Sequence, residues 1–282
     1  NAGQLASLDS VPWESLLAGD TVRIFYKPTP YASKMIISAK GTVQSPVRIC
    51  GVRGSNGERP VVTGINATTR TALAGTMGAQ GSYANSYNEA RGVFFIGKKT
   101  ADAWTDYPLY IQIDGLKIIG AHPSYQFTDT FGAKRNYQEF GACIWVDRGQ
   151  NITIADNDIS DCSQGIYSRS TDDGDFTVTK NLRIAGNTFT NNGIVAQEGK
   201  HTVYTESLGI VFEFNRFGPM RIGATGNSIQ DRSAGTVIRY NRIEDGAHAV
   251  DLVEAEDFPV IAKASPSYRN TYVYGNQISN PG

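Results

Sequence analysis

Residues 235–246 read GTVIRYNRIEDG, and close copies of this phrase recur along the chain. Each copy is an alternating apolar and polar run, then Asn, then one residue, then Ile or Phe. The copies are NITIADNDI (151–159), NLRIAGNTF (181–189), GIVFEFNRF (209–217) and NTYVYGNQI (270–278), and LYIQIDGLKI (109–118) is a weaker copy with Gly115 near the Asn position. The repeated asparagines are Asn157, Asn187, Asn215, Asn241 and Asn276, spaced by 30, 28, 26 and 35 residues. Self-similarity at this period predicts a solenoid.

The composition of the repeats indicates strands, because Val, Ile, Thr, Tyr and Phe at a period near two suit a pleated surface. One strand cannot fill a whole repeat, so each repeat must hold two or three short strands joined by bends. We therefore predict an all-β, single-stranded, right-handed parallel β-helix, with coils about 4.8 Å apart. The Asn then marks a sharp bend, where stacked side-chain amides would form a ladder between coils.

Length and charge exclude some classes of protein. The chain has 282 residues and a net charge of -1, so no electrostatic argument favours nucleic acid. No run approaches the length of a membrane-spanning helix. The chain begins at Asn1, from which we expect a processed chain that has lost an export signal. The three cysteines have no metal-type spacing. They are interpreted as small buried residues, with a bridge between Cys143 and Cys162 left open.

The domain organisation follows from the repeats. We expect one β-helix domain over residues 1–282, with a short capping helix at 8–19 (LDSVPWESLLAG). Two polar or small-residue segments, 67–91 and 121–141, are expected to be inserted loops, and 141–282 is expected to form regular coils. No capping helix is predicted after the last repeat, which leaves end-to-end self-assembly open.

Outward residues at equal repeat offsets lie above one another in a solenoid, so polar residues were aligned by their distance from the preceding Asn. This places on one broad stripe Asp172, Asp173, His201, Tyr204, Glu206, Asn227, Asp231, Arg232, Glu254, Glu256 and Asp257. Two segments of the stripe are dense in polar chemistry, GKHTVYTES (199–207) and TGNSIQDRSAG (225–235). The run DLVEAEDF (251–258) adds four carboxylates, which could hold calcium or form an ordinary solvated turn.

Candidate catalytic residues are His201, Tyr204 and Arg232. A His with a Tyr offers a base and an acid, and Arg232 offers a fixed cation for a carboxylate or sulfate. Candidate substrate-binding residues are Glu206, Asn227, Asp231 and Glu254, and no metal ligand is assigned. The alternative for each residue is an ordinary solvated position on an outward face. The cluster as a whole favours function.

Two parts of the chain resemble the right-handed parallel β-helix polysaccharide lyases, nearest to the alginate lyase and chondroitinase B group. LLAGDTVRI (16–24), GTVQSPVRICGV (41–52) and RPVVTG (59–64) resemble the N-terminal cap and first coils of that group. FEFNRF and SIQDRSAGTVIRYNRIEDG, within residues 212–246, resemble its central pattern of an Asn-x-Phe turn, a strand ending in a basic residue and Ser, and a further Asn turn.

The resemblance transfers only part of the family's site. The catalytic Lys of the family falls near Arg232. Its acidic calcium-holding pair falls near Thr225 and Asn227, and its second basic residue falls near Val253 or Glu254. Of these positions, only that of the catalytic Lys still carries a basic residue, Arg232. The resemblance therefore does not support calcium at that place, the cofactor stays unknown, and the Lys/Arg mechanism is not transferred whole.

The resemblance implies a secreted, periplasmic or cell-surface lyase that cleaves an acidic, uronate-containing polysaccharide by β-elimination. A base would take the C5 proton, Arg232 would neutralise the uronate carboxylate, and an acid would protonate the leaving oxygen. Two alternatives stay open, since a fold does not choose a function. One is a glycoside hydrolase using Asp231 with Asp257 or Glu254. The other is a non-catalytic surface, sheath or adhesin module that binds glycan or protein.

Overall fold

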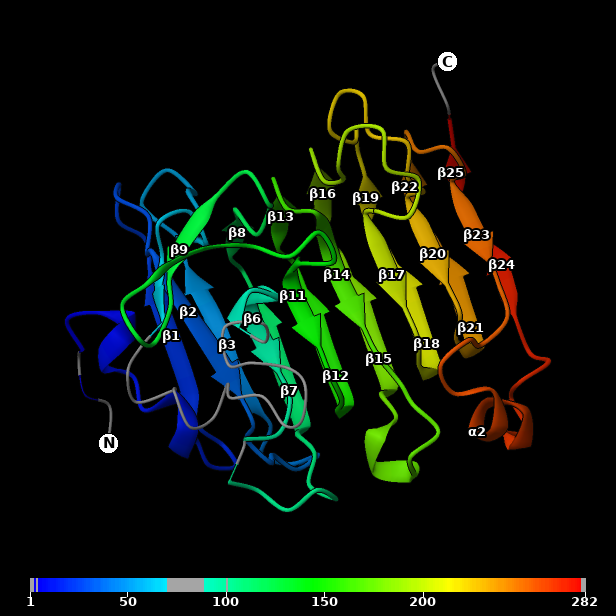
Figure 1. The fold of residues 1–282 in the computed structure, drawn as a ribbon, viewed down its shortest axis with the longest axis horizontal. Coiled ribbons are helices and arrows are strands. Elements are labelled where there is room, and N and C mark those ends of the chain that lie inside the picture. Colours follow the sequence, from blue (N-terminus) through cyan, green and yellow to red (C-terminus); the bar gives the residue numbers. More distant parts are fainter. Residues whose placement is uncertain (1–2, 4, 70–88, 100, 280–282) are drawn as a thin grey trace.

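Three long sheets of mostly parallel strands make up the molecule, and the computed structural model describes residues 3, 5–69, 89–99 and 101–279 (Figure 1). From residue 142 onward, each turn of the chain adds one strand to each sheet in succession. The eight-stranded sheet contains, in spatial order, β1 (Thr21–Phe25), β3 (Val47–Val52), β7 (Leu109–Asp114), β12 (Gln150–Ala155), β15 (Lys180–Ala185), β18 (Leu208–Glu213), β21 (Ala234–Arg239) and β24 (Tyr272–Tyr274).

The other two sheets follow the same order of coils, except at the start of the ten-stranded sheet, where three strands from later in the chain lie outside its first one. The ten-stranded sheet contains β10 (Lys134–Asn136), β9 (Gln126–Thr128), β5 (Thr68–Thr69), β2 (Ser33–Ile37), β6 (Gly92–Ile96), β11 (Ala142–Val146), β14 (Gln164–Ser168), β17 (Val203–Thr205), β20 (Ile229–Asp231) and β23 (Val250–Leu252). The seven-stranded sheet contains β4 (Val61–Thr63), β8 (Lys117–Ile119), β13 (Asp158–Ser160), β16 (Thr188–Thr190), β19 (Arg216–Phe217), β22 (Arg242–Ile243) and β25 (Gln277–Ile278). The predicted parallel β-helix is confirmed by these pairings.

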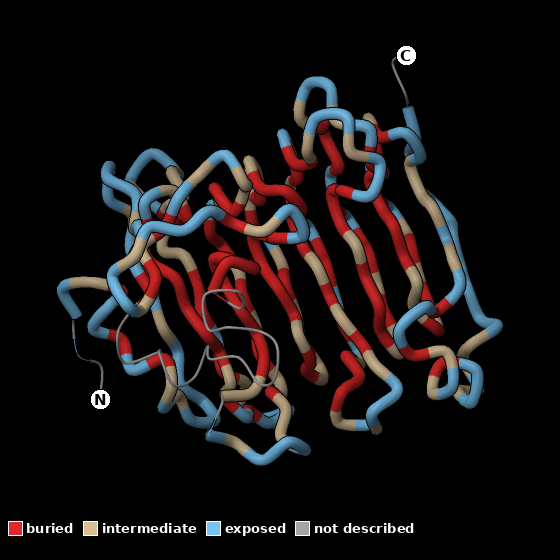
Figure 2. Tube along the Cα trace, viewed as in Figure 1, coloured by how far each residue is buried: buried red, intermediate tan, exposed pale blue. Residues whose placement is uncertain are grey.

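The core lies inside the coils and forms columns, because parallel register places like residues above one another. Ile113, Ile154 and Ile184 are paired in adjacent strands and are fully buried. The Ile or Phe after each Asn forms another column, in which the rings of Phe189 and Phe217 stack with centroids 4.8 Å apart. Figure 2 shows buried positions along the strands and exposed positions in the connections. Each enclosed aliphatic or aromatic side chain contributes about 1.5–3 kcal/mol.

The repeated asparagines occupy one corner, between the eight-stranded and seven-stranded sheets. The side-chain oxygen of Asn215 accepts the backbone N–H (3.0 Å) and the amide group (3.1 Å) of Asn187. Asn157 bonds to Asn187 in the same way, and Asn241 to Asn276. The amide of Asn215 also donates to the carbonyl of Ile184, at 2.8 Å. Each buried bend thus has its polar groups satisfied by the next coil.

The N-terminal segment differs from the expected helix over 8–19. It forms two single 3-10 turns, η1 (Leu8–Ser10) and η2 (Trp13–Ser15), in place of one continuous helix. Pro12 between them has no N–H to donate, and it keeps Val11 extended, with φ -73° and ψ 129°. Trp13 is nevertheless fully buried, and its Nε1 donates to the carbonyl of Leu8 at 2.9 Å.

The expected loops and regular coils also need correction. Residues 121–141 contain an antiparallel hairpin, β9 paired with β10, so this segment is not simply a loop. Most of the expected loop at 67–91 lies outside the described residues. The coils after residue 141 are interrupted by η4 (Asp175–Thr177) and α2 (Pro259–Ala264). In the part of the chain that the structure describes, no helix is long and apolar enough to cross a membrane.

A disulfide bond joins Cys143 to Cys162, the pair that the sequence left open. Cys143 lies in β11, and Cys162 follows β13 in the same turn of the solenoid. Cys50 is buried and unpaired. The bridge closes a segment with a sequence separation of 19 residues.

Candidate functional site

The outer face of the ten-stranded sheet carries a row of aromatic side chains. Trp145, Tyr167 and Tyr204 are paired in register on β11, β14 and β17. The ring centroids of Trp145 and Tyr167 are 4.0 Å apart, and those of Tyr167 and Tyr204 are 4.9 Å apart, both stacked nearly parallel. Gln230 and Asp251 continue the row on the next two strands. Tyr204 therefore marks the change from an aromatic to a polar surface.

A second row of alternating charge runs beside the aromatic one. It consists of the residues that lie two positions after Trp145, Tyr167, Tyr204 and Gln230 in the chain. On successive coils these are Asp147, Arg169, Glu206 and Arg232. Backbone hydrogen bonds keep the register, since the N–H of Arg232 donates to the carbonyl of Thr205 at 2.8 Å. Nη1 of Arg169 lies 3.7 Å from Oδ1 of Asp147. This face combines stacked aromatic rings with acidic and basic side chains, which suits a polar, partly apolar ligand such as a sugar chain.

Arg232 lies on the outside of the solenoid, as expected. Its Nη1 donates to the carbonyl of Glu254 at 3.0 Å, and its Nη2 lies 3.1 Å from Oε2 of Glu256. The guanidinium carbon is 5.9 Å from the ring centre of Tyr204. The side chain of Arg232 is only 17% exposed, whereas that of Glu256 is 61% exposed. The guanidinium is thus held in place, while its carboxylate partner is one that a ligand carboxylate could displace.

Glu206 is an enclosed acid beside Arg232. It is fully buried, and its Oε2 accepts the backbone N–H of Ser170 at 3.2 Å. Burial, together with the negative charge of Asp257, raises the pKa of Glu206 to about 7. Burial and the nearby Glu206 also raise the pKa of Tyr204 above its ordinary value, so its hydroxyl carries its proton at neutral pH.

His201 has a structural position that does not fit the expected role of a base. The residue is 6% exposed, and its Nδ1 accepts the backbone N–H of Asn227 at 2.9 Å. Nδ1 is therefore the unprotonated nitrogen, and its lone pair is engaged. Burial lowers the pKa of His201 to about 4, which keeps the ring neutral. The ring lies beside Tyr204, with centroids 6.0 Å apart, so His201 fixes the coil behind this phenol.

The expectation that Asp231 faces outward is wrong. Asp231 is 2% exposed, and its carboxylate accepts the hydroxyls of Thr205 (2.7 Å) and Thr236 (2.6 Å). On β20, Ile229 and Asp231 share the inward face, while Gln230 points outward. Burial raises the pKa of Asp231. The coils between successive asparagines differ in length. Counting residues from the Asn therefore places Asp231 one position out of register, which assigns it to the opposite face of the strand.

The other expected binding residues have mixed positions. The amide nitrogen of Asn227 donates to Gln230 at 2.8 Å and to Asp251 at 3.0 Å, so this side chain is engaged within the coils. Glu254 is exposed and meets Arg232 through its backbone carbonyl. Of the expected set, the structure brings Tyr204 and Arg232 together on the outer face, with Glu206 buried next to them, and leaves Asn227 and Asp231 buried within the coils.

Trp145 and Tyr167 were missed because they lie outside the segments that the alignment selected. A signal for them exists: an aromatic residue follows a buried Ile or Val in CIWV (143–146), GIYS (165–168) and TVYT (202–205). One edge of the site is formed by the end of the 121–141 segment. The ring of Phe140 lies 3.9 Å from Nζ of Lys200, the residue before His201.

Within residues 3, 5–69, 89–99 and 101–279, no group of three or more His, Cys, Asp or Glu side chains could hold a metal ion. No family model matches this chain, and no curated protein matches it either. A solved structure described as alginate lyase from Paenibacillus sp. str. FPU-7 overlays on 96% of this chain and 93% of its own, with a TM-score of 0.37 and 13% identity. So distant an overlay carries no argument about activity, and the fold stands on its own strand pairings.

Proposed function

We propose that this protein is a secreted carbohydrate-active enzyme that cleaves an acidic, uronate-containing polysaccharide by β-elimination. The observation that carries the proposal is the position of the Arg232 guanidinium, 5.9 Å from the ring centre of Tyr204, at the end of a row of stacked aromatic rings. The half-buried Tyr204 offers an apolar ring with a polar tip, and an arginine fork binds a carboxylate. The disulfide between Cys143 and Cys162 supports an oxidising compartment.

In the proposed reaction, Arg232 pairs with the uronate carboxylate and withdraws charge, so the C5 proton becomes more acidic. The carboxylate of Asp257, which interacts electrostatically with both Glu206 and Tyr204, takes that proton in place of His201. The C5–H electrons form the C4=C5 double bond, and the C4–O bond breaks. The Tyr204 hydroxyl, protonated at neutral pH, gives its proton to the leaving oxygen.

A hydrolase is the second candidate, and one observation favours it. Glu206 and Asp257 are neighbouring carboxyls in different environments, and the raised pKa of Glu206 would suit a general acid. Glu206 is fully buried, however, so its carboxyl does not reach the surface where a glycosidic bond would lie. The lyase is preferred for that reason. A binding or surface module is the outcome if the protein cleaves nothing.

The test is incubation with alginate, pectate, chondroitin and related polymers, followed by kinetics on the one that is cleaved. We expect absorbance from an unsaturated product. Arg232→Ala should lower kcat/KM by roughly tenfold or more, since a charge-assisted contact is worth about 1.5–3 kcal/mol. Tyr204→Phe should lower kcat more than it changes KM.

The matched control is Arg216→Ala, which removes an exposed arginine paired with Glu244 on the seven-stranded sheet. This control should keep the wild-type rate. New reducing ends without the absorbance of a double bond would favour the hydrolase. Unchanged rates in both site variants would remove Arg232 and Tyr204 from the chemistry.

A further inference from the structure

A groove lies on a different face, across the outside of the eight-stranded sheet. It has a volume of about 430 Å³. Its lining comes from five adjacent strands, β7, β12, β15, β18 and β21, and from the β2–β3 connection at one end. Because it crosses strands that are about 4.8 Å apart, it runs along the solenoid axis for about 19 Å. A linear polymer is the shape of ligand that such a groove accepts.

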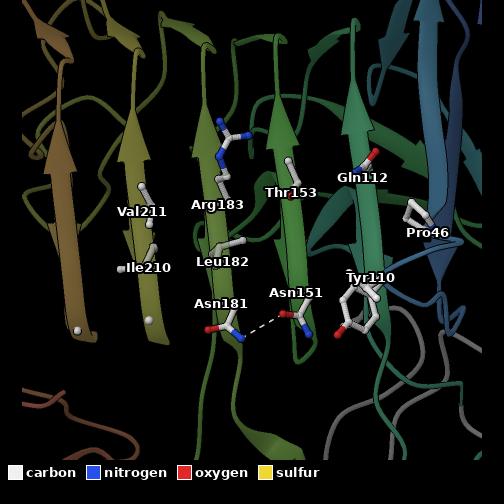
Figure 3. Close-up of a pocket in the computed structure, with 13 residues that line it drawn as sticks. Pro46, Tyr110, Gln112, Asn151, Thr153, Asn181, Leu182, Arg183, Ile210 and Val211 are labelled. Atoms are coloured by element: carbon white, nitrogen blue, oxygen red, sulfur yellow. Dashed lines mark hydrogen bonds between the residues drawn. The ribbon is translucent and has the colours of Figure 1, made fainter. Parts of the chain in front are cut away.

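The floor of the groove is a row of residues with left-handed backbone. Tyr110, Asn151 and Asn181 have φ of 50°, 58° and 51°, and Gly209 and Gly235 continue the row at 76° and 77°. Figure 3 shows Tyr110, Asn151 and Asn181 side by side near the start of their strands, with the Asn181 amide donating to Asn151 at 3.1 Å. The row thus offers one ring and two amides, and then two positions without side chains.

The next outward row adds hydroxyl, amide and cationic groups. Gln112, Thr153 and Arg183 are paired in register across β7, β12 and β15. The half-buried amide of Gln112 and hydroxyl of Thr153 match the hydroxyl groups of a sugar chain as both donors and acceptors. The groove is open, and Figure 3 shows its labelled side chains spread along the strands.

The charge of this face favours an anionic ligand. Arg183 and Arg239 share a single carboxylate, Glu213, with Nη2 to oxygen distances of 2.6 Å each. One positive charge in this trio is therefore uncompensated, and the Arg183 side chain is 46% exposed. The strands of the sheet also hold more basic than acidic residues, with Lys180 paired to Asp175 outside the strands and Arg48 paired to Asp114. These strands carry five basic residues against two acidic ones, Asp114 and Glu213, in a chain of net charge -1.

We propose that this groove is a second glycan-binding site, which holds a linear carboxylated oligosaccharide along the solenoid axis. Arg183 binds a carboxylate of the sugar chain, and Gln112, Asn151, Thr153 and Asn181 bind its hydroxyls. The site lies on the eight-stranded sheet, whereas Tyr204 and Arg232 belong to the ten-stranded sheet or follow directly from it. The ligand class follows from the lining of the groove and does not depend on the cleavage proposed above.

The test measures the affinity for end-labelled hexamers of mannuronate and galacturonate by fluorescence anisotropy, in a Tyr204→Phe, Arg232→Ala background that limits both cleavage and binding at the proposed lyase site. The groove variant is Asn151→Gly, Asn181→Gly and Arg183→Gln together. Glycine keeps the left-handed backbone while it removes both amides. We expect the Kd of the better hexamer to rise at least tenfold, with the circular dichroism spectrum and melting temperature near those of the parent.

The matched control is Asn191→Gly with Arg216→Gln. Asn191 is also exposed and left-handed, with φ 55°, and its amide donates to Asp161. Arg216 also pairs with one glutamate, Glu244. The control should bind like the parent. Equal binding by the groove variant and the parent, or no binding of either hexamer by the parent, would overturn the proposal. Equally tight binding of a hexaglutamate peptide or of a neutral glucan hexamer would overturn the assignment to a carboxylated glycan.

The two proposals fail separately. A protein that binds the hexamers through the groove but cleaves no polymer would disprove the lyase function and leave the groove intact. If the protein cleaves polymer but the groove variant binds the hexamers normally, the lyase function stands and the proposed glycan site in the groove is disproved.

Discussion

Glu206 shows how the fold can hold one acid against its ordinary chemistry. Its carboxyl is enclosed, and the negative charge of Asp257 lies nearby, so the protonated form is favoured and the pKa rises to about 7. In the unfolded chain the same group titrates near pH 4.3. The folded state therefore keeps a proton that the unfolded state has lost between these two values. Stability contributed by this group is complete at low pH and is lost as the pH rises toward 7.

Glu206→Gln should remove this loss. Relative to wild type, the variant's free energy of unfolding should rise by about 3 kcal/mol between pH 4 and pH 8, since one pKa unit corresponds to about 1.4 kcal/mol. Urea denaturation across that range measures it. Glu213→Gln is the control with opposite sign. Glu213 is buried as well, but its bonds to Arg239 and Arg183 lower its pKa, so that variant should lose relative stability as pH rises. A pH-independent difference for Glu206→Gln would contradict the assignment.

At the scale of the element, the position of the corner between the eight-stranded and seven-stranded sheets could be predicted from the sequence, whereas the positions of the other corners could not. The strand, the Asn and the Ile or Phe recur with fixed spacing because this bend has the same length in each coil from Asn157 onward. The other connections vary in length. Because of that variation, the alignment by distance from the Asn assigned Asp231 to the wrong face of its strand. The break at Pro12 was visible in the sequence and should have excluded a continuous N-terminal helix.

The stacked asparagines should behave differently inside the stack and at its end. Asn215→Leu leaves the backbone N–H of Asn187 and the carbonyl of Ile184 without a buried partner, which should destabilise the fold by about 1–3 kcal/mol. Asn276→Leu removes the equivalent bonds to Asn241, but Asn276 is partly exposed, so water can replace them. Its cost should be smaller. Chemical denaturation of both variants measures the difference, and equal costs would argue against the buried hydrogen bonds as its source.

At the scale of the whole molecule, the architecture followed from periodicity alone, whereas the site required the register between coils. A period near two and a repeat near 28 residues leave few folds other than a β-solenoid. The aromatic row does not appear as a motif, because Trp145, Tyr167 and Tyr204 are 22 and 37 residues apart in the chain. Only stacking of unequal coils brings them into contact. The groove on the eight-stranded sheet arises in the same way, from five strands together.

The disulfide gives a test of how one covalent link acts on this solenoid. Each coil contacts mainly its neighbours, so a link within one turn limits the unfolded chain over 19 residues. Replacing both Cys143 and Cys162 by Ala should lower the free energy of unfolding by about 3 kcal/mol, as expected for a closed loop of this length. Cys50→Ala is the control, since it removes a buried thiol without opening a loop. Guanidinium denaturation without reductant should separate the two variants. With reductant, the wild type should fall toward the double variant while Cys50→Ala keeps its small difference from wild type. A double variant no less stable than Cys50→Ala would show that the bridge does not restrict the unfolded chain.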